Sequence, residues 1–307
     1  MPLAGQPAMK HSAPVIHLID ASVYVFRAYY SMPSDMTDSE GRMINALYGY
    51  ARFLGDLLER VRPQYVVVAF DESLTTSFRN EIYPQYKANR EEPPEDLIWQ
   101  FAQCQRVTKA MGVSAYASDK YEADDIIGTL AHGIREQGKH FVVVTRDKDL
   151  TQLIREGDEY WDYASNKRFK YPDIQSHFGV RAEQIPDMLA LAGDSVDNIP
   201  GVPGVGPKTA IALLQHFDTL DAIYSDLNAV ADVKVRGARK LGERLAKHED
   251  LARLSRRLTG LSLHAPVPTT LRSMRWSAPD LPALAQLYDE FGVGQALREQ
   301  AKRLARL

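Results

Sequence analysis

The chain has 307 residues, of which 45% are hydrophobic and 25% charged, with a formal net charge of −3. These values are typical of a soluble globular protein with one large domain or two smaller ones. A single cysteine, Cys104, excludes an internal disulfide and a thiolate metal site. No stretch approaches the roughly 20 apolar residues that span a bilayer, and residues 1–12 hold no apolar run like a signal peptide, so we expect a cytoplasmic protein.

Positive charge is concentrated late in the chain. Residues 234–258 contain nine lysines and arginines against three acids, whereas the acidic residues described below lie earlier. A basic region separate from an acidic cluster suits a protein that binds a metal ion and a polyanion together.

Taken in order, residues 1–12 predict a flexible tail. Short apolar runs then predict buried strands at residues 15–19, 65–70 and 141–145. Apolar residues at helical spacing predict helices at 44–60, from about 95, and from Glu122. This alternation indicates an α/β fold with a mostly parallel sheet covered by helices on both faces.

Acidic residues follow all three predicted strands. Asp20 and Asp71 end the first two, and Asp147 and Asp149 follow the third. A single aspartate after a strand is usually a turn residue or a helix N-cap. Because the carboxyl ends of parallel strands form one edge where sites are built, three acidic strand ends together favour a shared site.

The densest acidic stretch is residues 121–128, where Glu122, Asp124 and Asp125 fall within four positions before an apolar helical pattern. On a helix, Glu122 and Asp125 are three residues apart and share a face. Negative charge in a first helical turn is also favoured by the helix dipole. Taken alone, the stretch leaves the capping and the ligand interpretations equally open.

Residues 72–111 do not continue the alternation of apolar strands and helices. Between 78 and 90, aromatic side chains and cations interleave, a composition that suits base stacking and phosphate pairing. A solvated loop with scattered aromatic residues is the alternative.

Beyond Arg181 the sequence predicts mainly helices. This region contains two further acids three positions apart, Asp194 and Asp197. A turn rich in glycine and proline at 199–210 then enters a helix at 209–217, and such a helix N-terminus favours an anion, here a DNA phosphate. The Gly-x-x-x-x-Gly-Lys-Ser/Thr spacing of a Walker loop is absent. The last 30 residues predict one or two amphipathic helices.

Nine carboxylates and no histidine are therefore candidates for one site: Asp20, Asp71, Glu122, Asp124, Asp125, Asp147, Asp149, Asp194 and Asp197. Acids packed together repel unless cations neutralise them. All-oxygen ligation favours Mg²⁺ or Mn²⁺, and so many acids imply two or more ions, as in sites that hydrolyse phosphodiesters.

Five segments in this order resemble the structure-specific 5′-nuclease (flap endonuclease) family: residues 18–20, 69–71, 121–125, 145–150 and 193–209. Over about residues 14–260 the chain resembles the N-terminal 5′–3′ exonuclease domain of bacterial DNA polymerase I and its free-standing relatives. The resemblance implies a PIN-like core with a helical arch and a C-terminal helix-three-turn-helix. It also implies divalent-metal-dependent 5′–3′ exonuclease and flap endonuclease activity, with the nine carboxylates holding two metal clusters.

The resemblance assigns roles to further residues. Contacts to the scissile phosphate and the terminal base fall to Arg27, Tyr86 and Lys87. The arch over the site would be lined by Arg79 and Arg90. Duplex phosphates, with a K⁺ ion, fall to the helix-three-turn-helix residues Gly201, Gly204, Gly206, Lys208 and Thr209.

The predicted organisation is a tail at 1–12, a nuclease core at 13–180 with the arch at about 72–111, the helix-three-turn-helix region at 181–262 and a helical extension at 263–307. The resemblance implies a bacterial, nucleoid-associated monomer that acts on branched or 5′-flap duplex DNA beside a DNA polymerase or ligase. Because 307 residues leave no room for a polymerase, we expect a free-standing nuclease.

The sequence allows three alternative functions to be compared with a nuclease. A non-catalytic DNA-junction binding protein would be favoured by missing ligands, and none of the nine is missing. A small PIN-type ribonuclease is disfavoured by the predicted arch and hairpin. A nicotinamide-dependent enzyme is excluded, because no Gly-x-Gly-x-x-Gly follows a strand.

Overall fold

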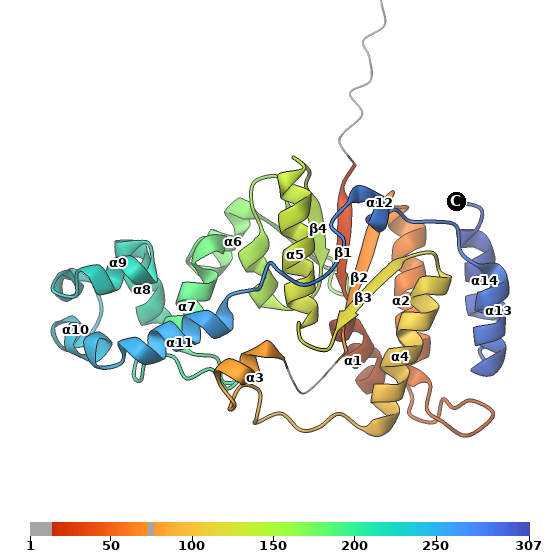
Figure 1. The fold of residues 1–307 in the computed structure, drawn as a ribbon, viewed down its shortest axis with the longest axis horizontal. Coiled ribbons are helices and arrows are strands. Elements are labelled where there is room, and N and C mark those ends of the chain that lie inside the picture. Colours follow the sequence, from red (N-terminus) through yellow and green to blue (C-terminus); the bar gives the residue numbers. More distant parts are fainter. Residues whose placement is uncertain (1–13, 73–76) are drawn as a thin grey trace, which may run out of the picture.

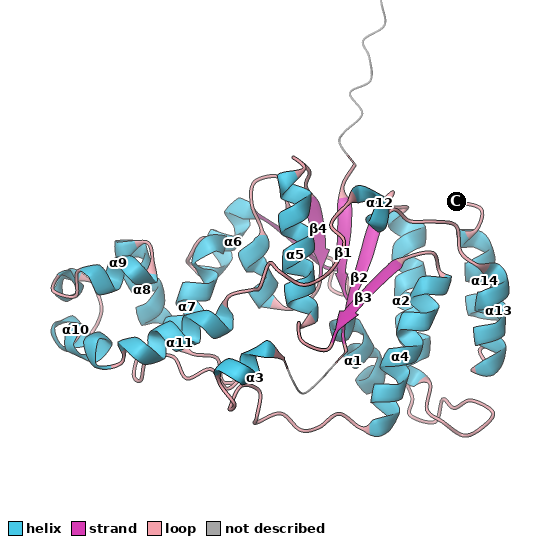
Figure 2. Ribbon diagram, viewed as in Figure 1, coloured by secondary structure: helices cyan, strands magenta, loops and turns pink. Residues whose placement is uncertain are grey.

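The computed structural model describes residues 14–72 and 77–307, so the predicted tail at 1–12 lies outside the described residues. A six-stranded sheet lies at the centre of the fold (Figures 1 and 2), in the order β3-β2-β1-β4-β5-β6. All neighbouring strands pair in parallel except β5 and β6, which are antiparallel. The strands are β1 Ile16–Asp20, β2 Tyr65–Asp71, β3 Ser114–Ser118, β4 Phe141–Val144, β5 Glu159–Asp162 and β6 Lys167–Lys170.

The inner strands are apolar along their length because both of their faces are buried. In β1, Leu18 packs into one core cluster and Ile19 into the other. Successive side chains of a strand point to opposite faces, so the sheet separates two cores. The predicted α/β fold with a mostly parallel sheet between helices is confirmed.

Helices cover both faces. One core contains side chains from α5 Ala123–Glu136, α6 Tyr171–Phe178 and α7 Ile185–Ala192. The other contains side chains from α1 Ala21–Ser31, α2 Asn45–Val61, α4 Glu95–Ala110, α13 Leu281–Glu290 and α14 Gln295–Leu304.

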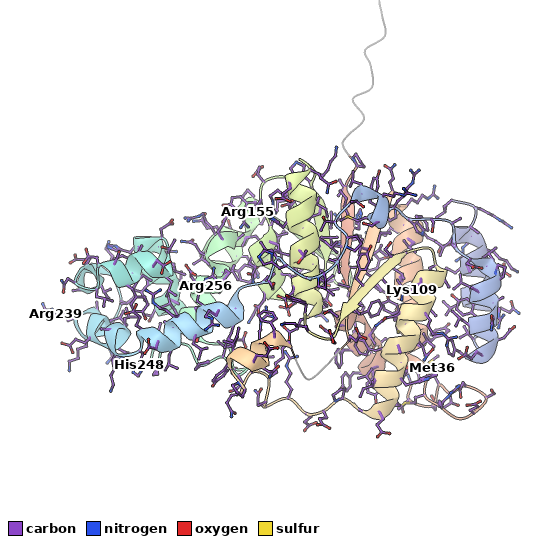
Figure 3. All side chains as sticks on the ribbon, in the orientation of Figure 1. Met36, Lys109, Arg155, Arg239, His248 and Arg256 are labelled. Atoms are coloured by element: carbon purple, nitrogen blue, oxygen red, sulfur yellow. The ribbon has the colours of Figure 1, made fainter. Side chains whose placement is uncertain are left out.

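A helical extension projects from the α7 side of the sheet (Figure 1). It contains α8 Pro207–Phe217, α9 Leu220–Ser225, α10 Ala238–Lys247 and α11 Glu249–Thr259. α11 packs along α7 and leads the chain back towards the sheet, where α12 Leu271–Met274 follows. The extension carries much of the basic region, including Arg239 and Arg256 (Figure 3).

The segment predicted as an arch divides into two parts. α4 packs its apolar side chains, including Leu97 and Phe101, into the core, so it is a covering helix of the sheet. The described remainder is residues 77–94, with the short α3 Phe78–Ile82. Residues 73–76, also within the predicted arch, lie outside the described residues. Among the described residues no helix is both long and apolar enough to cross a bilayer.

Candidate active site at the carboxyl edge of the sheet

The acids that follow β1, β2 and β4 meet because these strands are neighbours in the order β2-β1-β4 and run in parallel. Asp20 caps α1 and is almost fully buried. Its Oδ2 accepts a hydrogen bond from Thr145 Oγ1 at 2.8 Å. Burial, together with the negative charge of Asp71, raises the pKa of Asp20 to about 7.

Asp71 joins β2 to the first turns of two helices. Its Oδ2 accepts from Ser22 Oγ at 2.5 Å, and its Oδ1 accepts from the Ala123 backbone N–H at 2.8 Å. The half-buried carboxylate forms no ion pair with the described residues, and its desolvation raises its pKa. Ser22 and Thr145 are site residues that the sequence analysis missed, although each lies within two positions of a predicted acid.

Asp147 and Asp149 continue the edge after β4. Asp147 Oδ1 accepts from the Asp149 backbone N–H at 2.8 Å. Burial raises the pKa of Asp147, and burial with the charge of Asp147 raises that of Asp149 to about 7. Asp149 Oδ1 is buried and has no hydrogen-bond partner among the described residues.

Asp124 lies in the first turn of α5 and faces the same acids. Burial, and after it the charges of Asp147 and Asp20, raise the pKa of Asp124 well above its usual value. The structure thus brings five acids from four segments close enough to repel one another: Asp20, Asp71, Asp124, Asp147 and Asp149.

Glu122 differs because two cations contact it. Lys87 Nζ donates to its Oε1 at 2.5 Å, and Arg79 Nη1 donates to its Oε2 at 3.1 Å. Burial alone would raise the pKa of Glu122, but the charges of Lys87 and Arg79 hold it below its usual value. Lys87 itself has a φ of 56°, a left-handed conformation that is uncommon for a residue with a side chain and recurs at functional sites.

Asp194 and Asp197 close the site from the segment after α7. Lys148 Nζ lies 3.3 Å from Asp194 Oδ2. Asp197 accepts from Tyr86 at 3.2 Å and pairs with Arg90, and its backbone carbonyl accepts from the Lys87 N–H at 2.9 Å. These contacts hold residues 77–94 over the edge of the sheet.

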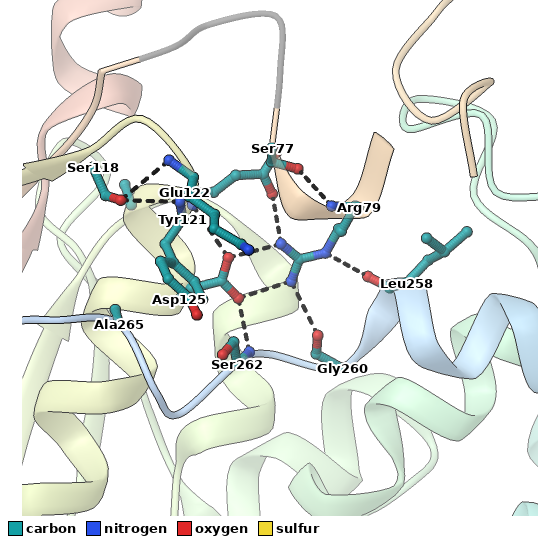
Figure 4. A network of polar contacts seen from close by, with 12 residues as sticks. Ser77, Arg79, Ser118, Tyr121, Glu122, Asp125, Leu258, Gly260, Ser262 and Ala265 are labelled. Atoms are coloured by element: carbon teal, nitrogen blue, oxygen red, sulfur yellow. Dashed lines mark hydrogen bonds and ion pairs between the residues drawn. The ribbon is translucent and has the colours of Figure 1, made fainter. Parts of the chain in front are cut away.

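Two predicted roles do not fit the structure. Arg79, expected to line the arch and bind DNA, is buried with its side chain 2% exposed, and its guanidinium binds Asp125 at 2.7 and 2.8 Å (Figure 4). Asp125, expected to be a metal ligand, is fully buried, and both of its oxygens are taken by Arg79 and backbone N–H groups. A carboxylate with both oxygens so engaged has no oxygen turned towards a metal.

Two further placements differ from the expectation. Tyr86 is buried against Ile199 and Leu258, so its ring face is not open for base stacking. Arg27 lies on the exposed side of α1, in a hollow of about 320 Å³ shared with Arg52, and none of the acids described above lines this hollow.

The predicted phosphate-binding residues Gly204 and Gly206 are exposed in the turn before α8. Lys208 is exposed and Thr209 half-buried in the first turn of α8. Gly201 is buried instead. With a φ of 61° and the Gly193 nitrogen 2.3 Å from the position of an added Cβ, it lets two backbone segments pass closely. Arg244 Nη1 donates to the Gly204 carbonyl at 3.2 Å, a contact that the sequence analysis missed.

Within residues 14–72 and 77–307, no three acidic, histidine or cysteine side chains already surround one point as in a closed metal cage. Ions such as Mg²⁺ keep several waters and bind through few carboxylates, so an open arrangement suits them. The all-oxygen donor set and the unpartnered, buried Asp149 Oδ1 fit such an ion.

Comparison with known proteins gives a consistent result. The family model described as "5′-3′ exonuclease, N-terminal resolvase-like domain" matches residues 15–179, and that described as "5′-3′ exonuclease, C-terminal SAM fold" matches residues 180–282. A protein named 5′-3′ exonuclease from Aquifex aeolicus is 33% identical over 94% of this chain and 95% of its own length.

DNA polymerase I of Rhizobium leguminosarum is 36% identical over 84% of this chain but only 26% of its own length. Across the DNA polymerase I relatives first compared, the chain spans about a quarter to a third of their length. A solved structure of the bacteriophage T5 flap endonuclease, in complex with DNA and metal ions, has the same fold with a TM-score of 0.62. It is 19% identical and covers 95% of this chain and 99% of the T5 chain.

Proposed function

The chain belongs to the 5′–3′ exonuclease family, and from this premise we propose that it is a divalent-metal-dependent nuclease. Its reaction is the hydrolysis of phosphodiester bonds at 5′ ends and at the junctions of branched duplex DNA, as a 5′–3′ exonuclease and a flap endonuclease. One observation carries the proposal: five acids close enough to repel one another form no ion pair within the described residues, and they lie beside a lysine paired with Glu122.

We propose that Mg²⁺ neutralises these acids and that Mn²⁺ can replace it. The ions would be held by the five unpaired acids and Glu122, with Asp194 and Asp197 on the opposite wall. When bound, two such ions activate a water for attack on phosphorus and stabilise the leaving 3′-oxygen.

Lys87 is the proposed catalytic cation. Its side chain is 18% exposed and its Nζ is paired with Glu122, and a phosphate entering the site competes with Glu122 for the N–H groups of Lys87. A cation placed there stabilises the negative charge that develops on the phosphoryl oxygens. Arg90, paired with Asp197 at the rim, is in position to contact the same strand.

Binding of the duplex falls, in this proposal, to the exposed turn with Gly204, Gly206 and Lys208. The backbone N–H groups at the start of α8 would meet a phosphate, with a K⁺ ion at the turn. Arg27 would contact the DNA backbone from α1. We also propose that the division at about residue 180 separates cleavage from duplex binding and that the chain acts as a monomer, passing its product to a DNA polymerase or ligase.

The test is cleavage of a 5′-labelled flap duplex in Mg²⁺, with EDTA and Asp147→Ala as controls. We expect metal-dependent release of short 5′ fragments near the junction, and loss of cleavage but not of DNA binding in Asp147→Ala. Tight binding without any cut in Mg²⁺ or Mn²⁺ would overturn the nuclease and leave a junction-binding protein.

A further inference from the structure

The guanidinium of Arg79 uses all of its donors inside the protein (Figure 4). Besides Asp125 and Glu122, it donates through Nε to the Leu258 carbonyl at 2.8 Å and through Nη2 to the Gly260 carbonyl at 3.0 Å. Since arginine carries five N–H groups in a fixed fork, these five contacts leave none for a ligand.

Asp125 completes the same network from α5. Its Oδ1 accepts from Arg79 and from the Ser262 backbone N–H at 2.8 Å, and its Oδ2 accepts from Arg79 and from the Glu122 backbone N–H at 3.2 Å. The Asp125 carboxylate is therefore hydrogen-bonded to the backbone before α5 and after α11 as well as to the Arg79 guanidinium.

Three segments meet in this network. α3 begins the segment that carries Lys87, and Glu122 caps α5, whose first turn contains Asp124. Residues 258–262 contain the end of α11, the last helix of the extension, and the residues that follow it. The same α11 holds the phosphate-binding turn, because Ser255 Oγ accepts from the Gly201 N–H at 3.1 Å.

We infer that Arg79, locked by Asp125, is a positioning residue that holds Glu122 and Lys87 in register with the duplex-binding extension. The inference rests on the proposed nuclease activity. Arg79 touches Glu122 directly at 3.1 Å, and Lys87 contacts the other oxygen of the same carboxylate at 2.5 Å. A displaced guanidinium therefore shifts the acid and the catalytic lysine together.

A bidentate arginine–carboxylate pair fixes geometry in a way that lysine cannot, although lysine keeps the charge. Arg79→Lys is for this reason the informative change. We expect it to slow single-turnover cleavage of a flap duplex by about 10- to 100-fold, since misplacement of catalytic groups by about 1 Å has effects of this size. Binding of the flap duplex in Ca²⁺ should remain close to that of the wild type.

Asp125→Asn and the double variant separate a clamp from a metal ligand. A clamp predicts that Asp125→Asn resembles Arg79→Lys and that the double variant is no slower than the slower single variant, because both changes break one unit. If Asp125→Asn abolishes cleavage while Arg79→Lys cleaves normally, Asp125 acts independently of Arg79 and the inference is overturned.

Arg135→Lys is the matched control. Arg135 lies in the last turn of α5, the helix that carries Asp125, and its Nη2 is 2.7 Å from Oδ2 of the buried Asp158. This variant should lower Tm without slowing the cleavage step. The inference also fails if Arg79→Lys lowers only Tm, or lowers neither Tm nor the rate. Should Arg79→Lys not fold, the size of the effect of Asp125→Asn carries the test. A clamp predicts cleavage slowed by about 10- to 100-fold with DNA binding intact, whereas a loss as complete as in Asp147→Ala would make Asp125 a metal ligand and overturn the inference. A wild-type chain that does not cut DNA would instead overturn the proposed function.

Discussion

The acids of the site form two groups that differ in their partners. On the sheet edge, Asp20 and Asp149 form no ion pair within the described residues, and burial raises their pKa to about 7. On the side of α3, Glu122 is paired with Lys87 and Arg79, and its pKa is lowered. Burial is similar on both sides, so the partner decides the sign of the shift. The unpaired group is incomplete without an added cation, whereas the paired group is complete.

Asp124→Asn should give the largest effect, because it removes charge from the unpaired group while keeping the shape of the side chain. We expect single-turnover cleavage of a flap duplex to fall on the order of a thousandfold. Asp289→Asn, on the exposed surface of α13, is the control. Cleavage by Asp124→Asn at the rate of that control would show that the two groups do not differ in function.

Lys87→Ala tests the paired group. Loss of its charge should slow single-turnover cleavage by about a hundredfold, since the amine is expected to stabilise charge that develops only in the transition state. Lys120→Ala, whose exposed amine lies 3.9 Å from Glu81, should cleave normally. An unchanged rate for Lys87→Ala at saturating DNA would limit Lys87 to holding Glu122 in place.

The pH dependence of the free energy of unfolding distinguishes the unpaired acids from the paired Glu122 in an experiment that needs no DNA. A carboxyl group with a folded pKa of about 7 and an unfolded pKa of about 4 keeps a proton that the unfolded chain has lost. In EDTA, stability should therefore fall as pH rises from about 4 to 7, and Tm should drop by several degrees. Mg²⁺ binds the ionised acids, so it should raise Tm at pH 8 and have little effect at pH 5.

Thermal denaturation with and without Mg²⁺ at both pH values measures this. Asp124→Asn has one acid fewer in the repelling group, and its Tm should fall less on the same rise in pH. A Tm in EDTA that increases from pH 5 to pH 8 would contradict the raised pKa values.

The sequence predicted the unpaired group better than the paired one, for a physical reason. Asp20 and Asp71 follow inner strands whose apolar runs are continuous, so both the strands and the acids at their ends stand out. Strands β3, β5 and β6 were missed because none of them contains a run of large apolar residues. Alanine and serine dominate β3, lysine and arginine dominate β6, and acids flank Tyr160 and Trp161 in β5. Their pairing depends on neighbours, not on local pattern.

The Arg79–Asp125 pair could not be foreseen in the same way. Arg79 contacts residues 43 to 181 positions away in the sequence, and nothing in the local sequence separates a buried arginine from an exposed one. The interleaved aromatic residues and cations of 78–90 suggested DNA contacts for all of them. The fold instead buries Arg79 and Tyr86 and leaves Lys87 and Arg90 nearer the surface.

Lys208→Ala should give the smallest effect, because Lys208 is exposed in the first turn of α8 and forms no ion pair with either acidic group among the described residues. Its exposed amine is expected to contact one phosphate, so the variant should bind flap DNA several-fold more weakly, with the slope of log K against log salt reduced by about 1. Lys302→Ala, on α14 at the other end of the molecule, is the control. Cleavage at saturating DNA should match the wild type, since the acids and Lys87 are untouched. A slower rate at saturation would instead mean that the turn acts on the site through α11, and Arg79→Lys should then remove that dependence. An unchanged salt slope would exclude a phosphate contact at Lys208.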